Sequence, residues 1–355
     1  MTLEIIEAPE QSELYAGVIA KSDHALLYHS PVYRRFLRRL MPDSQARSLI
    51  ALQDGVPTAA LPSMTRSGPY GTVVNSLPFY GSHGGVVSTP DASPTARTAL
   101  MDAFHARNRG DGVTWATVIS NPLTDDFPVL SQRKPDFRDE RIGQFTPLPE
   151  GSSREAVFDS ILAQCRQRHR TTVRKSLKSG YRISHDGSAE AMAELGVIHA
   201  QNMNAIGGLA KGPDVFSAIR DTFAYDSDYR VYRADTADGD CASMLLVFYY
   251  REFVEYFTPC TVDRYRNDQP LSALVITAMA DAVVERASRW WNWGGTWLSQ
   301  DGVYQYKSRW GAIDRPYHYL IWSYPGSPEP STLDPQMLKM EYPYFYTLPY
   351  QALES

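Results

Sequence analysis

Hydrophobic residues recur along this chain with two periods, one typical of strands and one typical of helices. Apolar runs of strand length, alternating or continuous, are bounded by Gly, Pro, Asn or Asp. They predict strands at 3–6, 46–52, 58–63, 113–119, 137–144, 229–234, 241–250, 252–260, 289–293 and 317–322. Helical spacing predicts helices at 31–40, 94–109, 154–178, 189–207, 213–225 and 270–288.

Short sequence signals mark the ends of several of these elements. Ser30 is a candidate N-cap, followed by a proline at the first helical position. Asp54 and the glycine after it suit the tight turn of a β-hairpin. A capping-box pattern at 152–155 opens a further helix, and Gly180 ends it. We therefore expect one continuous helix from 154 to 178.

The order of elements suggests a duplication. A hairpin, long strands, a glycine-containing loop, a helix and a strand follow one another in the first part of the chain, and this order recurs after residue 228. The sequence predicts an α+β protein with a first domain at 1–150 and a second at 151–325. A proline- and aromatic-rich tail at 326–355 is expected to dock on the fold.

Composition narrows the class of protein. The chain has 355 residues, more than one compact core usually holds, with 43% hydrophobic and 21% charged residues. Its net charge of −5 excludes a general nucleic-acid coat, and we expect no binding of DNA. The N-terminus has acidic residues and no apolar run, and no window reaches the length of a membrane span. We expect a cytoplasmic protein; peripheral membrane contact and the oligomeric state stay open.

Three widely spaced cysteines, Cys165, Cys241 and Cys260, provide neither a disulfide framework nor the spacing of a metal site. Ser-His-Asp sets, nucleophile elbows and metal-ligand clusters are also absent from the sequence patterns. We therefore expect no metal and no resident cofactor. Direct group transfer between two bound substrates fits this absence.

A strongly basic stretch lies at 166–182. It holds seven Lys and Arg residues and no acid, in a chain whose net charge is negative. Like charges four residues apart destabilise a helix unless an anion offsets them. The stretch indicates a contact with a phosphate-bearing ligand, with a solvated helix face as the alternative.

The stretch 290–311 combines aromatic residues with a glycine pair and one lysine. An aromatic strand is expected to break at Gly294 and Gly295, and Lys307 follows among tyrosine and tryptophan residues. Such rings partly desolvate an ammonium and favour cation–π contact. The alternative is a core hairpin in which Lys307 reaches out to water.

Two further loops are candidates for ligand contact. Residues 75–85 form a glycine-rich loop without the spacing of a nucleotide-binding loop, and it includes Tyr80 and His83. Residues 263–272 precede a helix, where backbone amides can hold phosphate, and include Arg266 and Asn267. A wide turn and a plain loop before a core helix are the respective alternatives.

Three motifs resemble the Fem (FemABX) family of aminoacyltransferases, which build peptidoglycan cross-bridges and consist of two GNAT-like domains. They are the aromatic-Lys-x-x-aromatic-Gly segment ending at 311, the SLPFYGxxGG loop at 76–85, and the arginine helix followed by K-x-G-Y-x-I at 178–183. The family's segment usually reads Phe-Lys-x-x-Phe-Gly, whereas this chain has Tyr306 and Trp310 as its aromatics. The resemblance implies two tandem GNAT-like domains with mostly antiparallel sheets and, from the chain length, no coiled-coil arm.

The resemblance also implies roles for single residues. Lys307 would contact the donor or the developing oxyanion, with Tyr306 packing against the donor, and Asp301 is a weaker candidate for the proton acceptor. Residues expected to bind the donor and its phosphates are Arg170, Arg174, Lys175, Arg266, Asn267 and Trp310. Residues expected to line the acceptor cleft are Tyr80, His83, Asn202, Asn204, Trp293, Gly294, Gly295 and Tyr304.

Three functions remain in view. The first is transfer of an aminoacyl group from aminoacyl-tRNA to an amine of a peptide, a peptidoglycan precursor or a natural product. The second is an acyl-CoA-dependent N-acyltransferase acting on an amino sugar or a cell-envelope metabolite. The third is a GNAT-like binding module without catalysis. The loop at 266–272 lacks the glycines with which GNAT enzymes hold CoA, and this favours the first.

Overall fold

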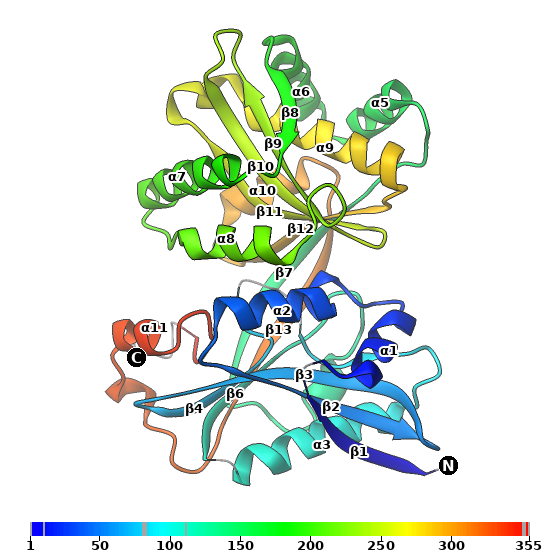
Figure 1. Cartoon of the computed structure of the whole chain (residues 1–355), viewed down its shortest axis with the longest axis vertical. Coiled ribbons are helices and arrows are strands. Elements are labelled where there is room, and N and C mark those ends of the chain that lie inside the picture. The colour runs from blue at the N-terminus through cyan, green and yellow to red at the C-terminus, as the bar shows by residue number, and fades with distance from the viewer. Residues whose placement is uncertain (1, 10, 80–83, 111, 350–352, 354–355) are drawn as a thin grey trace. The chain divides into compact units, whose positions relative to one another are not determined.

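The computed structural model describes residues 2–9, 11–79, 84–110, 112–349 and 353. The chain forms two compact units, one of residues 1–142 and 315–355 and the other of residues 143–314 (Figure 1). The predicted ranges differ from these units at two places. The change of unit falls within a strand near 142 and not at 150, and residues after 315 return to the first unit. Both crossings occur inside extended strands, which carry no linker-like composition.

The first unit is built on a sheet in the order β1-β2-β3-β4-β6-β13, with β5 beside β3. Its strands pair antiparallel except for β4 and β6, which are parallel. Strand bounds are β1 Leu3–Pro9, β2 Gln45–Gln53, β3 Val56–Gly68, β4 Gly71–Ser76, β5 Val87–Ser88, β6 Val113–Ile119 and β13 Ile313–Ser323. Helix bounds are α1 Glu13–Lys21, η1 Leu27–His29, α2 Pro31–Leu40, α3 Pro94–Gly110 and α4 Phe127–Leu130.

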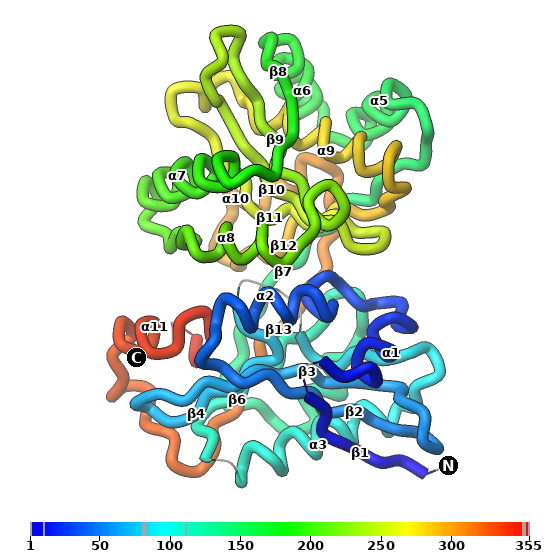
Figure 2. Tube along the Cα trace, in the orientation of Figure 1, coloured from blue at the N-terminus to red at the C-terminus, as the bar shows by residue number. Residues whose placement is uncertain are grey.

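The second unit repeats this plan, with strands in the order β7-β12-β11-β10-β9-β8 and a parallel pair formed by β11 and β12. Strand bounds are β7 Phe137–Pro147, β8 Arg182–Asp186, β9 Tyr229–Asp235, β10 Cys241–Tyr250, β11 Phe253–Thr261 and β12 Trp290–Trp297. Helix bounds are α5 Arg154–Gln164, α6 Gln167–Lys178, α7 Ala189–Ala205, α8 Pro213–Thr222, η2 Asp263–Asp268, α9 Pro270–Arg286 and α10 Asp301–Ser308. In each unit a long helix, α3 or α9, joins the two parallel strands (Figure 2).

This architecture confirms the predicted fold class. Both units are mixed α/β and mostly antiparallel, and the described residues contain no coiled-coil arm. The chain after 325 forms η3 Pro330–Thr332 and α11 Pro335–Glu341 and packs in the first unit. There Leu338 and Tyr342 contact Trp115 in one apolar cluster. No helix among the described residues is long and apolar enough to cross a membrane.

The expectation of one helix from 154 to 178 is wrong. Cys165 and Arg166 have extended backbone, with ψ of 148° and 142°, and separate α5 from α6. The Arg166 amide donates to the carbonyl of Arg309 at 3.0 Å instead of to a residue one turn earlier. Contact with a segment distant in the sequence therefore overrides the local helical pattern.

The expected break of the strand at Gly294 and Gly295 is wrong, and so is the alternative of a core hairpin at 290–311. Strand β12 continues through Gly294 and Gly295 to Trp297, so the glycine pair does not end it. The segment that follows is the helix α10 and not a returning strand. Asp301 and Lys307 are six positions apart in this helix, which is nearly two helical turns.

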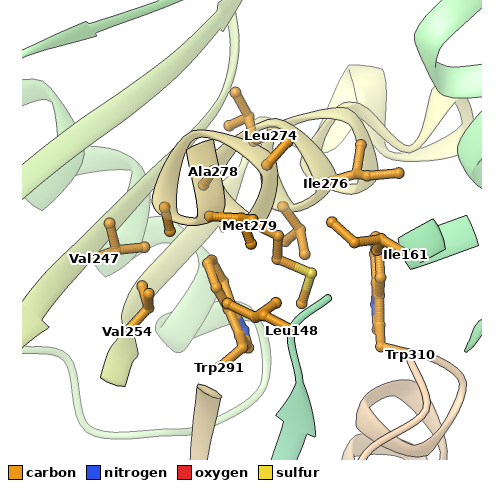
Figure 3. Packing of buried hydrophobic residues seen from close by; sticks show 14 of the residues in the cluster. Leu148, Ile161, Val247, Val254, Leu274, Ile276, Ala278, Met279, Trp291 and Trp310 are labelled. Atoms are coloured by element: carbon orange, nitrogen blue, oxygen red, sulfur yellow. The ribbon is translucent and has the colours of Figure 1, made fainter. Parts of the chain in front are cut away.

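The core of the second unit lies between α9 and its sheet. Successive residues of β10 are buried on both faces of the sheet, which explains the continuous apolar run in its sequence. Trp291 of β12 stands below α9, close to Met279 and Leu148 (Figure 3). Its side chain is completely buried. The parallel strand that positions the candidate site is thereby anchored in the core.

We predict that Trp291→Ala destabilises the second unit by about 3–5 kcal/mol, because the large cavity cannot close. Trp290→Ala, on the half-exposed neighbouring residue, is the control and should cost much less. Chemical denaturation followed by circular dichroism compares the two variants. Equal losses would mean that the core around α9 does not depend on Trp291.

Candidate functional site

The two parallel strands of the second unit separate after a short paired region. β11 and β12 are in register only from Phe253 opposite Trp290 to Glu255 opposite Asn292. Beyond this point β11 stays paired with β10, and an extra residue at Phe257 interrupts that register. The separation leaves a fork, which we define as the segments 256–261 of β11 and 293–297 of β12.

The first unit shows no such separation. Its parallel strands β4 and β6 remain paired from Thr72 opposite Val113 to Ser76 opposite Val118, where β4 ends. Backbone groups released from a ladder must find other partners, and a bound ligand can supply them. Among the described residues, the second unit is therefore the one whose parallel strands separate before either strand ends.

A buried pair of side chains closes the base of the fork. The Glu255 carboxylate accepts a hydrogen bond of 2.7 Å from the Asn292 side-chain amide, and Glu255 is only 1% exposed. The Asn292 side-chain oxygen in turn accepts from the Gly294 amide at 2.8 Å. Gly294 has φ of +71°, and a Cβ placed there would meet no atom within 4 Å. Asn292 thus supports a left-handed backbone position beside open space.

Lys307 points its ammonium group at this glycine pair. Its Nζ donates to the carbonyls of Gly294 at 3.3 Å and Gly295 at 3.1 Å, and to the Thr296 hydroxyl at 2.7 Å. The residue is 5% exposed, and burial lowers the pKa of Lys307 to about 7. The three acceptors match the three donors of an ammonium and oppose this loss of charge. Lys307 therefore does not reach out to water.

The aromatic rings next to Lys307 in the sequence, Tyr306 in α10 and Trp310 just after it, do not contact its ammonium group. Tyr306 and Trp310 are four residues apart and share one face. Their rings are each 5.9 Å from that of Trp293, and His169 lies 4.5 Å from Trp310. Among the described residues Lys307 makes no cation–π contact, so that expectation is wrong. The aromatic cluster orients α10, and Trp310 is completely buried within it.

Two buried polar side chains, Thr296 and Gln144, extend the hydrogen bonding around Lys307. The Thr296 hydroxyl donates to the side-chain oxygen of Gln144 at 3.4 Å, and both residues are completely buried. The Gln144 side-chain nitrogen donates to the Ser308 hydroxyl at 3.1 Å. The sequence analysis did not identify Gln144, Thr296, Glu255 or Asn292. A polar residue in an otherwise aromatic strand, such as Asn292, was the available signal.

The basic stretch forms an exposed surface on α6 and at the start of β8. Its seven cations make no ion pair among the described residues, although Arg170 donates to the Cys165 carbonyl at 3.0 Å and Arg166 to Gln305. Ser176 on the buried side of α6 donates to the Gln269 carbonyl at 2.7 Å, directly before α9. The surface, named here the α6 cationic surface, thus lies next to the N-terminus of α9.

The other residues expected to bind the donor lie close to the same helix N-terminus. Arg266 and Asn267 are exposed in η2, immediately before α9, and Arg266 forms an ion pair of 3.1 Å with Asp263. Arg174 and Lys175 are exposed on α6. The helix α6, which carries the candidates at 170–175, thus contacts the residue that precedes α9, and η2, which carries those at 266–267, leads directly into α9, whereas Trp310 is buried.

The candidate acceptor residues are distributed more widely. Asn202 is engaged with the backbone of Thr261, through bonds of 2.8 and 2.9 Å. Asn204 is exposed near the end of α7, and the Tyr304 hydroxyl donates to Asp314 at 2.7 Å. Asp301 is exposed as the first residue of α10. Tyr80 and His83 lie outside the described residues.

The described residues of this site offer no set of side chains that could hold a metal ion. The described residues contain no group of three or more His, Cys, Asp or Glu side chains placed to hold a metal ion. The histidine next to the aromatic cluster, His169, has a pKa lowered to about 4 by burial. The arrangement can instead supply one buried ammonium, main-chain groups along separated strands, and a cationic surface.

Comparison with known proteins shows the fold. No family model matches this chain, and no curated protein does. The crystal structure of FemX aligns with a TM-score of 0.68 at 14% identity, covering 89% of this chain and 97% of that one. A tandem GNAT protein from the clavulanic acid biosynthesis pathway aligns with a TM-score of 0.58 at 11% identity, covering 92% and 99%.

A third structure, L-PGS from Bacillus licheniformis, aligns with a TM-score of 0.51 at 11% identity, covering 96% of this chain and 98% of that one. These identities are too low to transfer an activity, but the alignments span nearly the whole length of each protein. The chain therefore has the tandem GNAT-like fold seen in FemX, as its motifs predicted.

Proposed function

We propose that this chain is an N-acyltransferase that moves an aminoacyl group from aminoacyl-tRNA to the amine of a peptide, peptidoglycan-precursor or natural-product acceptor. The observation that carries the proposal is the position of Lys307, a buried ammonium directed at a glycine pair on one strand of an open fork. The similarity of fold to FemX and to the tandem GNAT protein supports the reaction class by analogy.

The proposed reaction needs little from the protein beyond position and charge. The acceptor nitrogen attacks the ester carbonyl, an amide bond forms, and the bond to the tRNA hydroxyl breaks. The nitrogen gives up a proton and the leaving oxygen gains one, so no oxidant or metal is consumed. Negative charge develops on the carbonyl oxygen, where a preorganised cation stabilises it. Asp301, exposed to water at the start of α10, remains the candidate proton acceptor.

Lys307 is suited to the role of that cation. All three of its donors are engaged, and the bond to the Gly294 carbonyl is the longest at 3.3 Å. Gly294 also borders open space. If Lys307 exchanged its hydrogen bond to Gly294 for one to the reacting oxygen, its other two hydrogen bonds would remain, and the free-energy cost would be small. The glycine pair thereby allows a substrate to approach the ammonium closely.

The α6 cationic surface is proposed to bind the phosphates of the donor. A chain with net charge −5 needs a local patch to attract a polyanion, and these cations lack carboxylate partners among the described residues. The N-terminus of α9, next to this surface, adds main-chain donors and the positive end of a helix dipole.

An acyl-CoA donor is the second candidate, because the same cations and helix N-terminus suit the phosphates of CoA. The segment Arg266–Ser272 lacks the glycines that let a backbone wrap a diphosphate, and this favours tRNA. Incubation with charged tRNA or with acyl-CoA, followed by detection of amide product and of free thiol, distinguishes the two donors. Transfer from neither donor would support a binding module.

We predict that Lys307→Met lowers single-turnover transfer about a hundredfold or more, because one preorganised charge is lost. Melting temperature should also fall, since three acceptors lose their donor in a buried place. Transfer at the wild-type rate would assign Lys307 a structural role only. Substrate binding by the variant, measured separately, shows that a loss of transfer is not simple unfolding.

We further predict that wild-type transfer declines as pH rises through about 7, the pKa of Lys307, because the ammonium loses its proton. Lys307→Arg keeps its charge at every accessible pH and should lose this decline, although its planar fork restores the rate only in part. Rate profiles of both proteins between pH 6 and 9 provide the measurement. An identical decline in the arginine variant would assign the titration to another group.

Replacing Arg170 and Arg174 with Gln should weaken donor binding and flatten its dependence on salt, because fewer counterions are released. Arg35→Gln with Arg39→Gln removes the same charge from α2 and is the control. Affinity for tRNA and for CoA is measured from low to moderate salt. Equal effects of both double variants would indicate a general charge effect and not a site on α6.

A further inference from the structure

Lys307 is held in place from behind by a chain of uncharged polar groups that begins on another strand. Gln144 belongs to β7, Thr296 to β12 and Lys307 to α10. The shortest contact of the ammonium, 2.7 Å, is to the Thr296 hydroxyl, and this hydroxyl contacts the Gln144 side-chain oxygen at 3.4 Å. The two other contacts of the ammonium are to backbone carbonyls of glycine, the residue type with the most backbone freedom. The Thr296 side chain, by contrast, is completely buried in the strand, so its hydroxyl is the more firmly placed acceptor.

The orientation of the Gln144 amide is determined by its surroundings. Its nitrogen faces three acceptors, which are the Ser308 hydroxyl at 3.1 Å, an Asp314 carboxylate oxygen at 3.3 Å and the Tyr304 carbonyl at 3.5 Å. Its oxygen, which can only accept, therefore faces Thr296. The single hydroxyl hydrogen of Thr296 must point at Gln144, and its lone pairs are left for Lys307.

This arrangement favours one protonation state of the lysine. A hydroxyl that can only accept stabilises an ammonium more than a neutral amine, which would need at least one donor for its lone pair. Burial acts in the opposite direction and is the cause of the lowered pKa of Lys307. Three titratable residues belong to the surrounding hydrogen bonds. The Tyr304 hydroxyl donates to Asp314, whose carboxylate contacts Gln144, and the Glu255 carboxylate contacts Asn292, so none of these titratable groups contacts the ammonium.

We propose that Thr296 and Gln144 are positioning residues that keep Lys307 charged and directed at the glycine pair. This inference rests on the proposed function only for its effect on turnover, because the effect on Lys307 itself is independent of any substrate. A second support, Glu255 with Asn292, acts on the Gly294 backbone instead. Removing Asn292 would leave a buried carboxylate without its amide partner and destabilise the fold, so Thr296 offers the cleaner test.

The experiment compares Thr296→Val, which has the same shape without the hydroxyl, with Thr296→Ser, which keeps it. The pKa of Lys307 is measured by NMR titration of protein labelled with 13C at lysine Cε, and the resonance absent from Lys307→Met identifies the residue. Loss of one hydrogen bond to a charged group should lower the pKa by about one to two units in the valine variant. The serine variant should retain the wild-type value.

The pH–rate profile provides the second reading. In Thr296→Val the decline in transfer should move to lower pH by the same amount as the NMR pKa, and Thr296→Ser should restore it. An unchanged Lys307 pKa in the valine variant overturns the inference. If that variant does not fold, Gln144→Met, which frees the Thr296 hydrogen to face Lys307, carries the same expectation.

Failure of the proposed function has a different signature. A wild-type protein that transfers from neither donor, but whose Lys307 pKa still falls in Thr296→Val, keeps the positioning role and loses the acyltransferase. A protein that transfers normally while its Lys307 pKa does not respond keeps the activity and loses the positioning role.

Discussion

One buried ammonium group determines how the second unit arranges its candidate site. Lys307 is almost fully removed from water, and a charge in that position is stable only if each of its protons has a partner. Strand β12 supplies all three partners from consecutive residues, Gly294 to Thr296. These three residues follow directly after the short region in which β12 is paired with β11.

The two units share a plan but differ at this place. In the first unit the parallel strands β4 and β6 stay paired to the end of β4, whereas in the second β11 and β12 part after Glu255 and Asn292. Units that share one plan therefore need not share the same pairing of their parallel strands. The buried Glu255–Asn292 bond marks the point of separation.

Although the net charge of the protein is negative, the surface of α6 carries enough positive charge to attract an anion. The cations of α6 face solvent without carboxylates beside them in the described chain, and Ser176 ties this helix to the start of α9. By contrast, Arg266 is neutralised by Asp263. The α6 cationic surface and the fork belong to the same unit, so the proposed donor would meet both within that unit.

The sequence by itself determined most strands and helices, because periodicity acts over short distances, and the resemblance of its motifs to the Fem family predicted the tandem GNAT-like fold. Only the tertiary structure decided the break at Cys165, which depends on Arg309, and the direction of Lys307, which turns from the rings beside it to carbonyls of β12. Gln144 could not be foreseen, since it lies 163 residues before Lys307 in sequence and approaches it only when β7 enters the sheet of the second unit. Partners of a buried polar group are selected by what the fold brings within about 3 Å, and no local pattern records that choice.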